Sequence, residues 1–509
     1  MNYLELLKLA SPEVIVVITA LAVLTVGLTS GRGTVGAAVS AAKLKASAGD
    51  TPATTATASA ICSAVAALGL VVAVGAVLML PQHAMLVSGM LVITPLTSLF
   101  KIICLALAFF TVLLARGDRA SRNPGEYLAI LLLATIGLML LVGSEEFLMI
   151  FIGLELTGLS LYVMVAFDKT DVRSAEAGLK YFLFGSTASA FTLFGISFIY
   201  GMSGTTGLAA IGQKLTTESV QPLLAVGIVM TLIGFAFKIA AAPFHLWAPD
   251  AYQGAPVPSA AFIASGSKVA SFVVLGKIVL VGFGPVHGSA DWHAMVAGWM
   301  PVLAALAALS IVVGNLVALA QSNVRRLLAY SAVAHAGYTL LGLVAGGRDG
   351  FSATLFYTTV YAITLVGAFG VVALVRRETG GDDFSHFSGL SSRSPLFAGC
   401  MAIFMLSLAG MPPLAGFFGK FYLFSAAVRA GPNHGLLWLV ALALFGSLIS
   451  LYYYLIILKV IFMDEPATEI STFKVDWLQK FTVGALALAV LLLGVMPEIL
   501  VARVIAAVP

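Results

Sequence analysis

Charged residues are scarce in this chain. Asp, Glu, Lys and Arg make up 10% of its 509 residues, hydrophobic residues make up 60%, and the mean hydropathy is +1.04. A soluble globular protein has a larger charged share than this. The net charge of +4 is too small and too dispersed to indicate a nucleic-acid partner. We therefore expect a membrane protein that crosses the bilayer many times.

Cysteine and the common cofactor motifs are also rare or missing. Cys62, Cys104 and Cys400 lie inside apolar runs at no metal-ligand spacing, so we expect packing residues and no disulfide. The sequence contains no GxxxxGK[ST] loop, no CxxC and no Rossmann glycine pattern in a βαβ context. We therefore expect no cofactor in this chain.

Apolar runs of about 20 residues recur along the whole sequence, without the alternating ten-residue segments of a membrane β-barrel. They predict an all-α polytopic membrane protein with about 14 transmembrane helices. The predicted spans are 13–30, 59–80, 92–115, 126–143, 146–167, 175–200, 221–242, 257–282, 295–319, 325–346, 351–375, 396–428, 434–462 and 478–502. We expect an exposed loop at 31–58. The N-terminus lacks the basic region and cleavage site of a signal peptide, so we expect it to be retained.

Lysine and arginine are unevenly shared between the two sets of loops. With fourteen spans, only Lys8, Lys214, Arg348, Arg429 and Arg503 fall on one side, and the other loop cations fall on the opposite side. Cytoplasmic loops carry the excess of positive charge. The pattern therefore predicts that both termini lie on the outer face.

Predicted helices 7 and 12 are both interrupted by proline, at AAAPFH (240–245) and AGMPPLAG (409–416), with Lys238 and Lys420 nearby. Because the two lie five spans apart, they would have opposite orientations, as in the inverted repeats of transporters. We expect repeats of helices 4–8 and 9–13. The corresponding division of the chain is 1–125, 126–282, 283–462 and 463–509.

The cations inside the predicted spans are all lysines. Lys180, Lys238, Lys268 and Lys420 lie well inside, whereas every arginine falls in a loop or at a segment end. Arginine keeps its proton in proteins, whereas a desolvated lysine can release it. An ionisable group within the membrane is by default a candidate functional residue. The pattern indicates protonation changes inside the bilayer.

Three further residues extend this polar line. Glu155 is the carboxylate nearest a span centre, and it could exchange a proton with a buried lysine that it meets. His245 lies seven residues after Lys238, about 10 Å along a continuous helix. His335 lies inside a span, and a neutral imidazole can accept and donate a proton at once.

Structural roles remain open for the same residues. Lys180 could form an ion pair with Glu176, and Lys268 could bond to a carbonyl of a broken helix. His335 could be a packing residue, and Glu155 and Lys238 could form a static salt bridge. The Lys420 side chain could reach toward one membrane surface. We expect Lys101, Lys277 and Lys459, nearer the span ends, to reach toward the surface. We expect the tyrosines at 452–454 to be packing or interface residues.

The same stretches resemble the antiporter-like membrane subunits of bacterial proton-translocating NADH:quinone oxidoreductase (respiratory complex I). The matching segments are GLELTGLSLYVMVAF (153–167), SAEAGLKYFLFGSTASAFTLFGISFIYG (174–201), GFAFKIAAAPFHLWAPDAYQGAPVPSAAFIASGSKVA (234–270), GNLVALAQSNVRRLLAYSAVAHAGYTLLGL (314–343) and LSLAGMPPLAGFFGKFYLF (406–424). Within this family, WAPDAYQGAP and GKFYLF look like the subunit N type rather than the L and M types.

The resemblance implies a proton channel driven by quinone reduction elsewhere in the complex. It assigns Glu155 and Lys238 as the gating pair, Lys180 as an additional lysine, Lys268 as the central connector, Lys420 as the lysine of the exit half-channel, and His245 and His335 as residues of the polar axis. It implies no cofactor in this subunit, and NAD, FMN, iron–sulfur clusters and quinone in partner subunits. The other membrane-arm and peripheral-arm subunits would be its partners, in the bacterial inner membrane.

Two other functions remain open. A subunit of a multisubunit cation/proton antiporter or of a membrane-bound hydrogenase would share the fold and the buried lysines. A purely structural subunit would keep the polar axis without using it.

Overall fold

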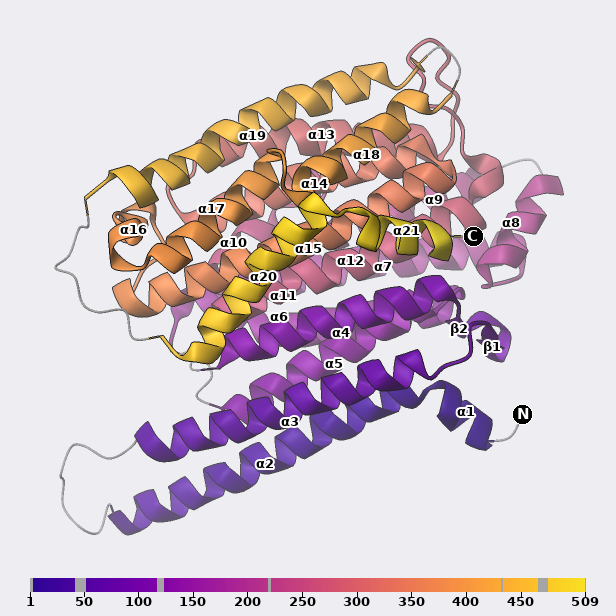
Figure 1. Cartoon of the computed structure of the whole chain (residues 1–509). Coiled ribbons are helices and arrows are strands. Elements are labelled where there is room, and N and C mark those ends of the chain that lie inside the picture. Colours follow the sequence, from indigo (N-terminus) through magenta and orange to yellow (C-terminus); the bar gives the residue numbers. More distant parts are fainter. Residues whose placement is uncertain are drawn as a thin grey trace.

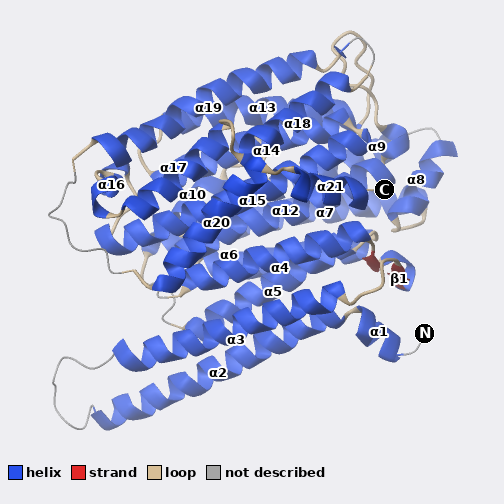
Figure 2. Cartoon of the chain, in the orientation of Figure 1, coloured by secondary structure: helices blue, strands red, loops and turns tan. Residues whose placement is uncertain are grey.

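The computed structural model describes residues 3–41, 52–116, 123–217, 221–431, 434–465 and 475–508, which are nearly all helical (Figure 2). The helices of the first half are α1 (Tyr3–Leu9), α2 (Ser11–Ala41), α3 (Pro52–Leu78), α4 (Pro95–Ala115), α5 (Pro124–Gly143), α6 (Phe147–Val165), α7 (Val172–Ser203), α8 (Leu208–Thr217), α9 (Pro222–Lys238) and α10 (Trp247–Gly254). Those of the second half are α11 (Val257–Phe262), α12 (Lys268–Lys277), α13 (Trp299–Leu319), α14 (Val324–Ala345), α15 (Gly347–Thr379), α16 (Leu390–Arg393), α17 (Pro395–Ala409), α18 (Ala415–Arg429), α19 (Leu437–Met463), α20 (Trp477–Val495) and α21 (Glu498–Ala507).

A small antiparallel sheet and several short helical turns complete the described elements. The strands β1 (Ala84–Leu86) and β2 (Leu91–Ile93) pair at one end of the bundle, beside the start of α4 (Figure 1). The short turns are η1 (Val87–Gly89), η2 (Ile263–Ser267), η3 (Ile278–Gly282), η4 (Gly284–Val286) and η5 (Phe384–Phe387).

Twelve of the described helices are long and apolar enough to cross a membrane, and two shorter apolar helices, α9 and α17, precede the two breaks. The prediction of an all-α polytopic membrane protein is confirmed, and the chain is a multi-pass membrane protein. The predicted total of fourteen transmembrane helices, which counts each broken helix as one span, stays a prediction. The division of the chain into repeats also stays a prediction.

The predicted loop at 31–58 is wrong in its extent. Helix α2 continues to Ala41 and α3 begins at Pro52, and residues 42–51 lie outside the described residues. Helix α2 runs on through Gly31, Gly33 and Gly36, and α3 begins with Pro52 at its first position, where the missing amide donor costs no hydrogen bond. The small-residue composition of this stretch was therefore misleading as a loop signal.

The core is formed by the central helices. The segment 257–282 runs through α11, the π-helical turn η2, α12 and the π-helical turn η3. Of the residues in its most apolar stretch, 94% are buried, and the same holds for α14. In α2, in contrast, 33% of the residues in the most apolar stretch are buried. Figure 1 shows α2 and α3 as an outlying pair. A π turn inside a helix re-aims the side chains that follow it. Lys268 directly follows η2, at the centre of the bundle.

The two broken helices end in the same backbone geometry. Ala240 and Gly410 have φ values of 58° and 86°, and the next residue in each case bonds back to the carbonyl five residues earlier. These are the bonds Ala241 N to Ala236 O (2.8 Å) and Met411 N to Leu406 O (3.0 Å). This pairing is the Schellman helix end. The two proline-containing sequences therefore follow helices that end in the same way.

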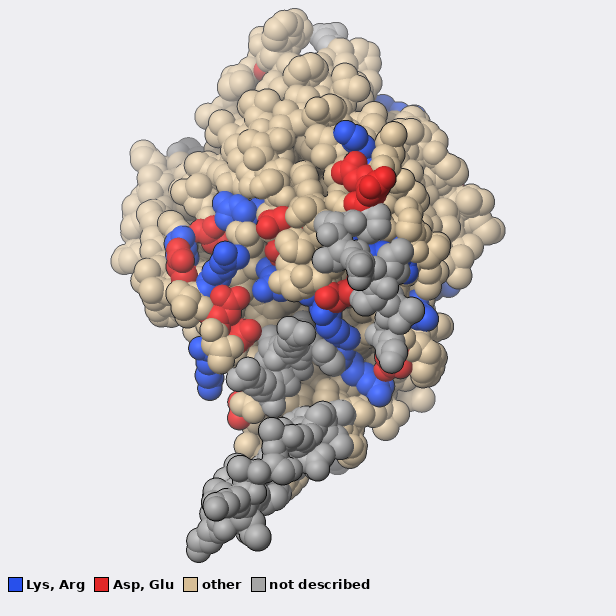
Figure 3. Space-filling model, turned by 90° about the vertical axis from the view of Figure 1, so that its left-hand side faces the viewer, with Lys and Arg blue, Asp and Glu red and all other residues tan. Residues whose placement is uncertain are grey.

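Charged side chains gather on one end of the bundle, which we call the charged face (left in Figure 1, facing the viewer in Figure 3). Ion pairs join its loops and helix ends: Arg116–Asp476, Arg376–Asp171 and Arg393–Glu378. The opposite face carries β1, β2, α8 and α21.

Candidate functional site

Lys238 ends α9 at the first break, and its side chain is buried. Its Nζ lies 3.4 Å from the carbonyl oxygen of Leu154 on α6 and 5.7 Å from the ring centre of Tyr162. A lysine over an aromatic face at this distance is a cation–π contact. Lys238 is therefore held by a carbonyl dipole and a π face.

Glu155 is next to Leu154, but its carboxylate points to a different partner. It accepts a hydrogen bond from Ser189 on α7. Its charge acts on both Lys238 and Tyr162. Within the described residues, however, Glu155 and Lys238 form no ion pair, since no N–O distance between them is 4.0 Å or less. The static salt bridge that the sequence left open is not formed in this structure.

Two glycines make room for this group. A Cβ at Gly158 would lie 2.8 Å from Lys238 Nζ and 3.2 Å from the Tyr162 hydroxyl, and a Cβ at Gly185 would lie 2.0 Å from that hydroxyl. The Tyr162 hydroxyl is buried and has no hydrogen-bond partner among the described residues. Buried polar groups are usually bonded, so this unpaired hydroxyl beside a lysine is an exception.

Lys268 begins α12 at the centre of the molecule. Its Nζ donates to the carbonyl of Ala332 on α14 at 2.6 Å and lies 5.6 Å from the ring centre of Tyr361. The sequence left open a bond from Lys268 to a carbonyl of a broken helix. That alternative is wrong, since the carbonyl is that of Ala332, in the continuous helix α14.

His335, also on α14, is enclosed by tyrosines. Its Nδ1 lies 2.6 Å from the Tyr357 hydroxyl and its Nε2 lies 3.1 Å from the Tyr454 hydroxyl. The ring also contacts the rings of Tyr338 and Tyr361, at centroid distances of 5.6 and 4.9 Å. Because a hydroxyl can donate or accept, this chain of groups can hold a proton in more than one arrangement.

Lys420 lies on α18, after the second break. Its Nζ donates to the carbonyl of Ala409 at 3.0 Å and to the Ser447 hydroxyl at 2.8 Å, and it lies 5.2 Å from the ring centre of Tyr338. The side chain is 5% exposed. The alternative in which Lys420 reaches toward a membrane surface is therefore wrong. Lys238 precedes its break and Lys420 follows its break, so the two lysines are not equivalent positions of a repeat.

Lys238, Lys268 and Lys420 thus share one environment, and we call them the lysine axis. Each is buried, donates to a backbone carbonyl and lies over a tyrosine ring. None forms an ion pair with a carboxylate in the part of the chain that the structure describes. A lysine keeps N–H donors in both protonation states, so the carbonyl bond survives proton loss. Such a site suits a proton carrier better than a salt bridge would.

Lys180 lies apart from this environment. It pairs with Glu176 at 2.7 Å and with Asp250 at 2.9 Å, its side chain is 42% exposed, and Asp250 also binds Arg326. The ion pair with Glu176 that the sequence left open is present.

His245 lies in the break between α9 and α10, so the spacing of a continuous helix does not apply to it, and the predicted break near Pro243 is confirmed. It is 7% exposed, and its Nδ1 has no hydrogen-bond partner among the described residues. Its ring meets Tyr330 edge-on at 6.2 Å. The structure does not bring its ring into hydrogen-bond contact with the lysine axis.

Two lysines expected near the membrane surface are buried. Lys101 pairs with Glu13 at 2.6 Å, and Lys277 pairs with Glu145 at 3.4 Å, with exposed fractions of 1% and 4% for the two lysine side chains. The expectation that they reach toward the surface is wrong, whereas Lys459 is exposed. Proximity to a span end does not determine which face of the helix meets the protein.

Sequence reasoning missed the tyrosines. Tyr453 and Tyr454 are buried, and the Tyr453 hydroxyl donates to Asn315, which in turn donates to Tyr338. Tyr452 is 63% exposed, as an interface residue would be. The spacing of Tyr357 and Tyr361, four residues apart on one face of a predicted span, was a signal that could have indicated a cluster of tyrosines.

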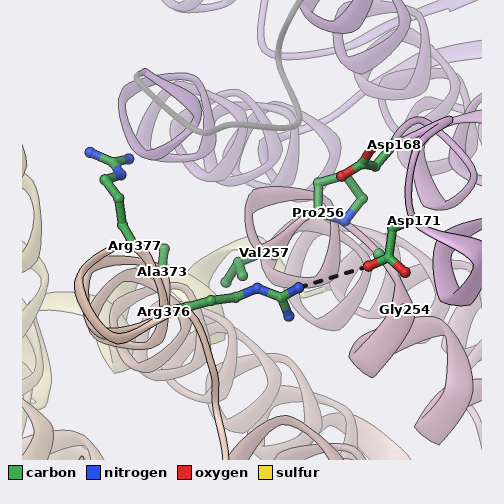
Figure 4. A pocket seen from close by; sticks show the side chains of 10 residues that line it. Asp168, Asp171, Gly254, Pro256, Val257, Ala373, Arg376 and Arg377 are labelled. Carbon is green, nitrogen blue, oxygen red and sulfur yellow. Dashed lines mark ion pairs between the residues drawn. The ribbon is translucent and has the colours of Figure 1, made fainter. Parts of the chain in front are cut away.

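A pocket opens on the charged face (Figure 4). Asp168 and Asp171 precede α7, Gly254 to Val257 join α10 to α11, and Arg376 comes from the end of α15. Arg376 points toward Asp171, at 3.9 Å. The pocket lies at the start of the central segment 257–282, since Val257 lines it.

Comparison with known proteins decides the family. Residues 144–450 match the model of the transmembrane family described as NADH:quinone oxidoreductase/Mrp antiporter. This chain belongs to that family. The matched residues contain the whole lysine axis and both breaks.

Relatives of this NADH:quinone oxidoreductase/Mrp antiporter member extend over most of its length. It is 46% identical over 437 residues to NADH-quinone oxidoreductase subunit N 2 of Acidobacterium capsulatum, covering 84% of this chain and 87% of that protein. It is 40% identical over 435 residues to subunit N of Desulforamulus reducens, covering 85% and 88%. Respiratory complex I from Thermus thermophilus contains a similar chain, with 30% identity, a TM-score of 0.76, and coverage of 96% and 98%.

An archaeal membrane-bound sulfane sulfur reductase shares the fold at 24% identity and a TM-score of 0.81, covering 100% of this chain and 98% of that one.

Proposed function

We propose that this chain is a proton-translocating membrane-arm subunit of an NADH:quinone oxidoreductase. The observation that carries the proposal is the lysine axis: Lys238, Lys268 and Lys420 are buried against carbonyls and tyrosine rings, without a carboxylate counter-ion. Buried charges without a partner are costly, so such an arrangement is retained for function rather than stability.

In this proposal the proton moves along the axis in steps. Lys238 receives it while the Glu155 carboxylate is near, and releases it when Glu155 is held away by Ser189. Lys268 receives it next. His335 then connects the two lysines, because its ring contacts Tyr361, over which Lys268 lies, and Tyr338, over which Lys420 lies. A proton path couples to another process only if it has two states with different proton affinities. The position of Glu155 supplies that difference.

Lys180 and His245 have lesser parts in this proposal. Lys180 is held with Asp250 and Arg326, so it acts on the electrostatics of the path without carrying the proton. His245 lies in the first break, and its Nδ1 has no hydrogen-bond partner among the described residues. In this proposal it can bind a proton temporarily near Lys238.

The energy comes from quinone reduction in partner subunits. NAD, FMN, iron–sulfur clusters and quinone belong to those partners, which include the related antiporter-like subunits of the membrane arm and the subunits of the peripheral arm. The chain lies in the inner membrane of a bacterium, with the charged face toward the cytoplasm and both termini outside. The cation excess on one set of loops supports this orientation.

The main rival is a subunit of a cation/proton antiporter or a membrane-bound hydrogenase, which the shared fold permits. Relatives named NADH-quinone oxidoreductase subunit N, at 40–46% identity over about 85% of the chain, favour the oxidoreductase.

Purification of the tagged chain from native membranes separates the two. We expect it to co-purify with a peripheral arm that contains flavin and iron–sulfur clusters and oxidises NADH. Purification with antiporter subunits alone, without flavin, would contradict the proposal. A purely structural role would be supported instead if neutral substitutions at Glu155, Lys238 and Lys420 left turnover intact.

A further inference from the structure

A second group of buried charges lies away from the lysine axis. Lys277 ends α12, on the same central segment as Lys268, and pairs with Glu145 between α5 and α6. Lys101 on α4 pairs with Glu13 on α2. Unlike the axis lysines, both of these lysines have a carboxylate partner. We call these four residues the outer charge cluster.

The two pairs meet at the end of α5. Lys277 Nζ donates to the Val142 carbonyl at 2.9 Å, and a Cβ at Gly143 would lie 3.2 Å from Lys101 Nζ. The charge of Lys101 acts on Lys277. A side chain at position 143 would press against the end of the Lys101 side chain, which would have to shift. The end of α5 is therefore shared by two cations from different helices.

Apart from their ion pair, Lys101 and Glu13 have no hydrogen-bond partner among the described residues, although both are buried. A purely structural pair is expected to have its remaining donors and acceptors bonded, because unbonded buried groups cost free energy. The pair is therefore poorly explained as a stabilising tie.

Lys277 and Glu145 line a cavity of about 720 Å³. The cavity lies between the start of α4, the end of the central segment 257–282 and the C-terminal end of α21. Figure 1 places these elements on the face opposite the charged face. His83, His287 and Arg348 also line it. Glu145 is 29% exposed there, whereas Lys277 is 4% exposed. The carboxylate meets the cavity and the amine lies behind it.

We propose that Glu145 and Lys277 form a proton-exchange station between this cavity and the interior. The proton leaves the Lys277 ammonium, binds the Glu145 carboxylate and passes to water in the cavity, and the reverse steps reload the amine. Lys277 is nine residues from Lys268, about 14 Å along the central segment, a gap that a chain of about four waters would span.

The inference rests on the proposed function, because it gives the protons of the lysine axis an opening on the face opposite the charged face. The Lys101–Glu13 pair extends the station toward α2 and α4, and the charge of Lys101 acts on Lys277 in addition to that of Glu145.

The opening can be tested without any pumping. In the assembled complex, a Glu145→Cys variant is treated with a membrane-impermeant maleimide in vesicles of both orientations, and Lys169→Cys, exposed beside the charged face, is the matched control. We expect Glu145→Cys to be labelled only from the side that does not label Lys169→Cys. The native cysteines Cys62, Cys104 and Cys400 are buried, so the wild type gives the background. Labelling from the same side as the control, or from neither side, would overturn the proposal.

The proton step is tested by three further variants of the complex. We expect Lys277→Met and Glu145→Gln to lower the protons moved per NADH, with assembly normal on a native gel, and the exposed Lys459→Met to match the wild type. Lys277→Arg keeps the charge and the carbonyl bonds but cannot release its proton. We expect it to fail like Lys277→Met, whereas a structural tie would be rescued by arginine, which would overturn the proposal.

The two proposals fail differently. If Lys238→Met stops pumping but Lys277→Met and Glu145→Gln do not, the station is wrong and the proposed function stands. If none of the three affects pumping, the proposed function is wrong, and the station falls with it even if the maleimide reaches position 145.

Discussion

Lys238 on α9 and Glu155 on α6 lie near each other without forming an ion pair. Lys238 bonds to the carbonyl of Leu154, one residue before Glu155, while the Glu155 carboxylate accepts from Ser189. The pair is therefore one side-chain movement away from contact. A gate needs this property, since a permanently closed salt bridge would hold its proton in one place.

The space around Lys238 depends on Gly158. We expect Gly158→Ala to lower NADH-driven proton pumping, because its Cβ would lie 2.8 Å from Nζ and would displace the amine. Pumping in proteoliposomes and assembly on a native gel measure this. Gly201→Ala, whose Cβ would meet no atom within 4 Å, is the control. Equal pumping by the two variants would show that the position of the amine is not critical.

The hydrogen bond between Tyr357 and His335 is expected to matter for turnover. Tyr357→Phe keeps the ring but removes the hydroxyl 2.6 Å from His335 Nδ1. A lost hydrogen bond of about 1 kcal/mol predicts roughly fivefold slower coupled turnover. NADH oxidation coupled to pumping measures it, with Tyr452→Phe, on the exposed tyrosine, as the control. If Tyr357→Phe is as fast as that control, His335 is a packing residue.

Arginine substitutions separate carriers from fixed charges. Arginine keeps the positive charge but cannot release its proton. We therefore expect Lys268→Arg to abolish pumping and Lys180→Arg, at the half-exposed ion pair with Glu176 and Asp250, to retain most of it. The protons moved per NADH are the measurement. Pumping by Lys268→Arg at the wild-type ratio would mean that this lysine supplies only charge.

Stability near the charged face is expected to depend on Arg325. It is 2% exposed, bonds to Asp382 and donates to the Ala255 carbonyl at 2.8 Å. Arg325→Ala leaves a buried carboxylate with less compensation, which costs about 3–5 kcal/mol. Arg116→Ala, at a half-exposed pair, is expected to cost about 1 kcal/mol or less. Thermal unfolding in detergent compares them, and equal melting temperatures would contradict the ranking.

Much of the fold could be predicted from the sequence because apolar runs and prolines are local signals. The breaks after Lys238 and Ala409 follow from proline, which cannot continue a helix. The burial of Lys101 and Lys277 could not be predicted this way, because it depends on which helices pack against α4 and α12.

The sequence was enough to predict which lysines belong to the candidate site, but not which tyrosines and carbonyls they contact. A lysine in an apolar run is conspicuous, whereas Tyr338, Tyr361 and Tyr454 look like any membrane aromatic until the fold places them beside Lys268, His335 and Lys420. The carbonyl of Ala332 carries no sequence signal at all, since every residue has one.

The central claim is that Lys238 carries protons. Its direct test is proton pumping per NADH oxidised by the purified complex in proteoliposomes, with wild type compared with Lys238→Met and with Lys459→Met, and with assembly checked on a native gel. The account predicts that Lys238→Met loses pumping, together with coupled turnover, in an intact complex. Pumping at the wild-type ratio by an assembled Lys238→Met complex would contradict it and would leave the lysine axis a structural feature.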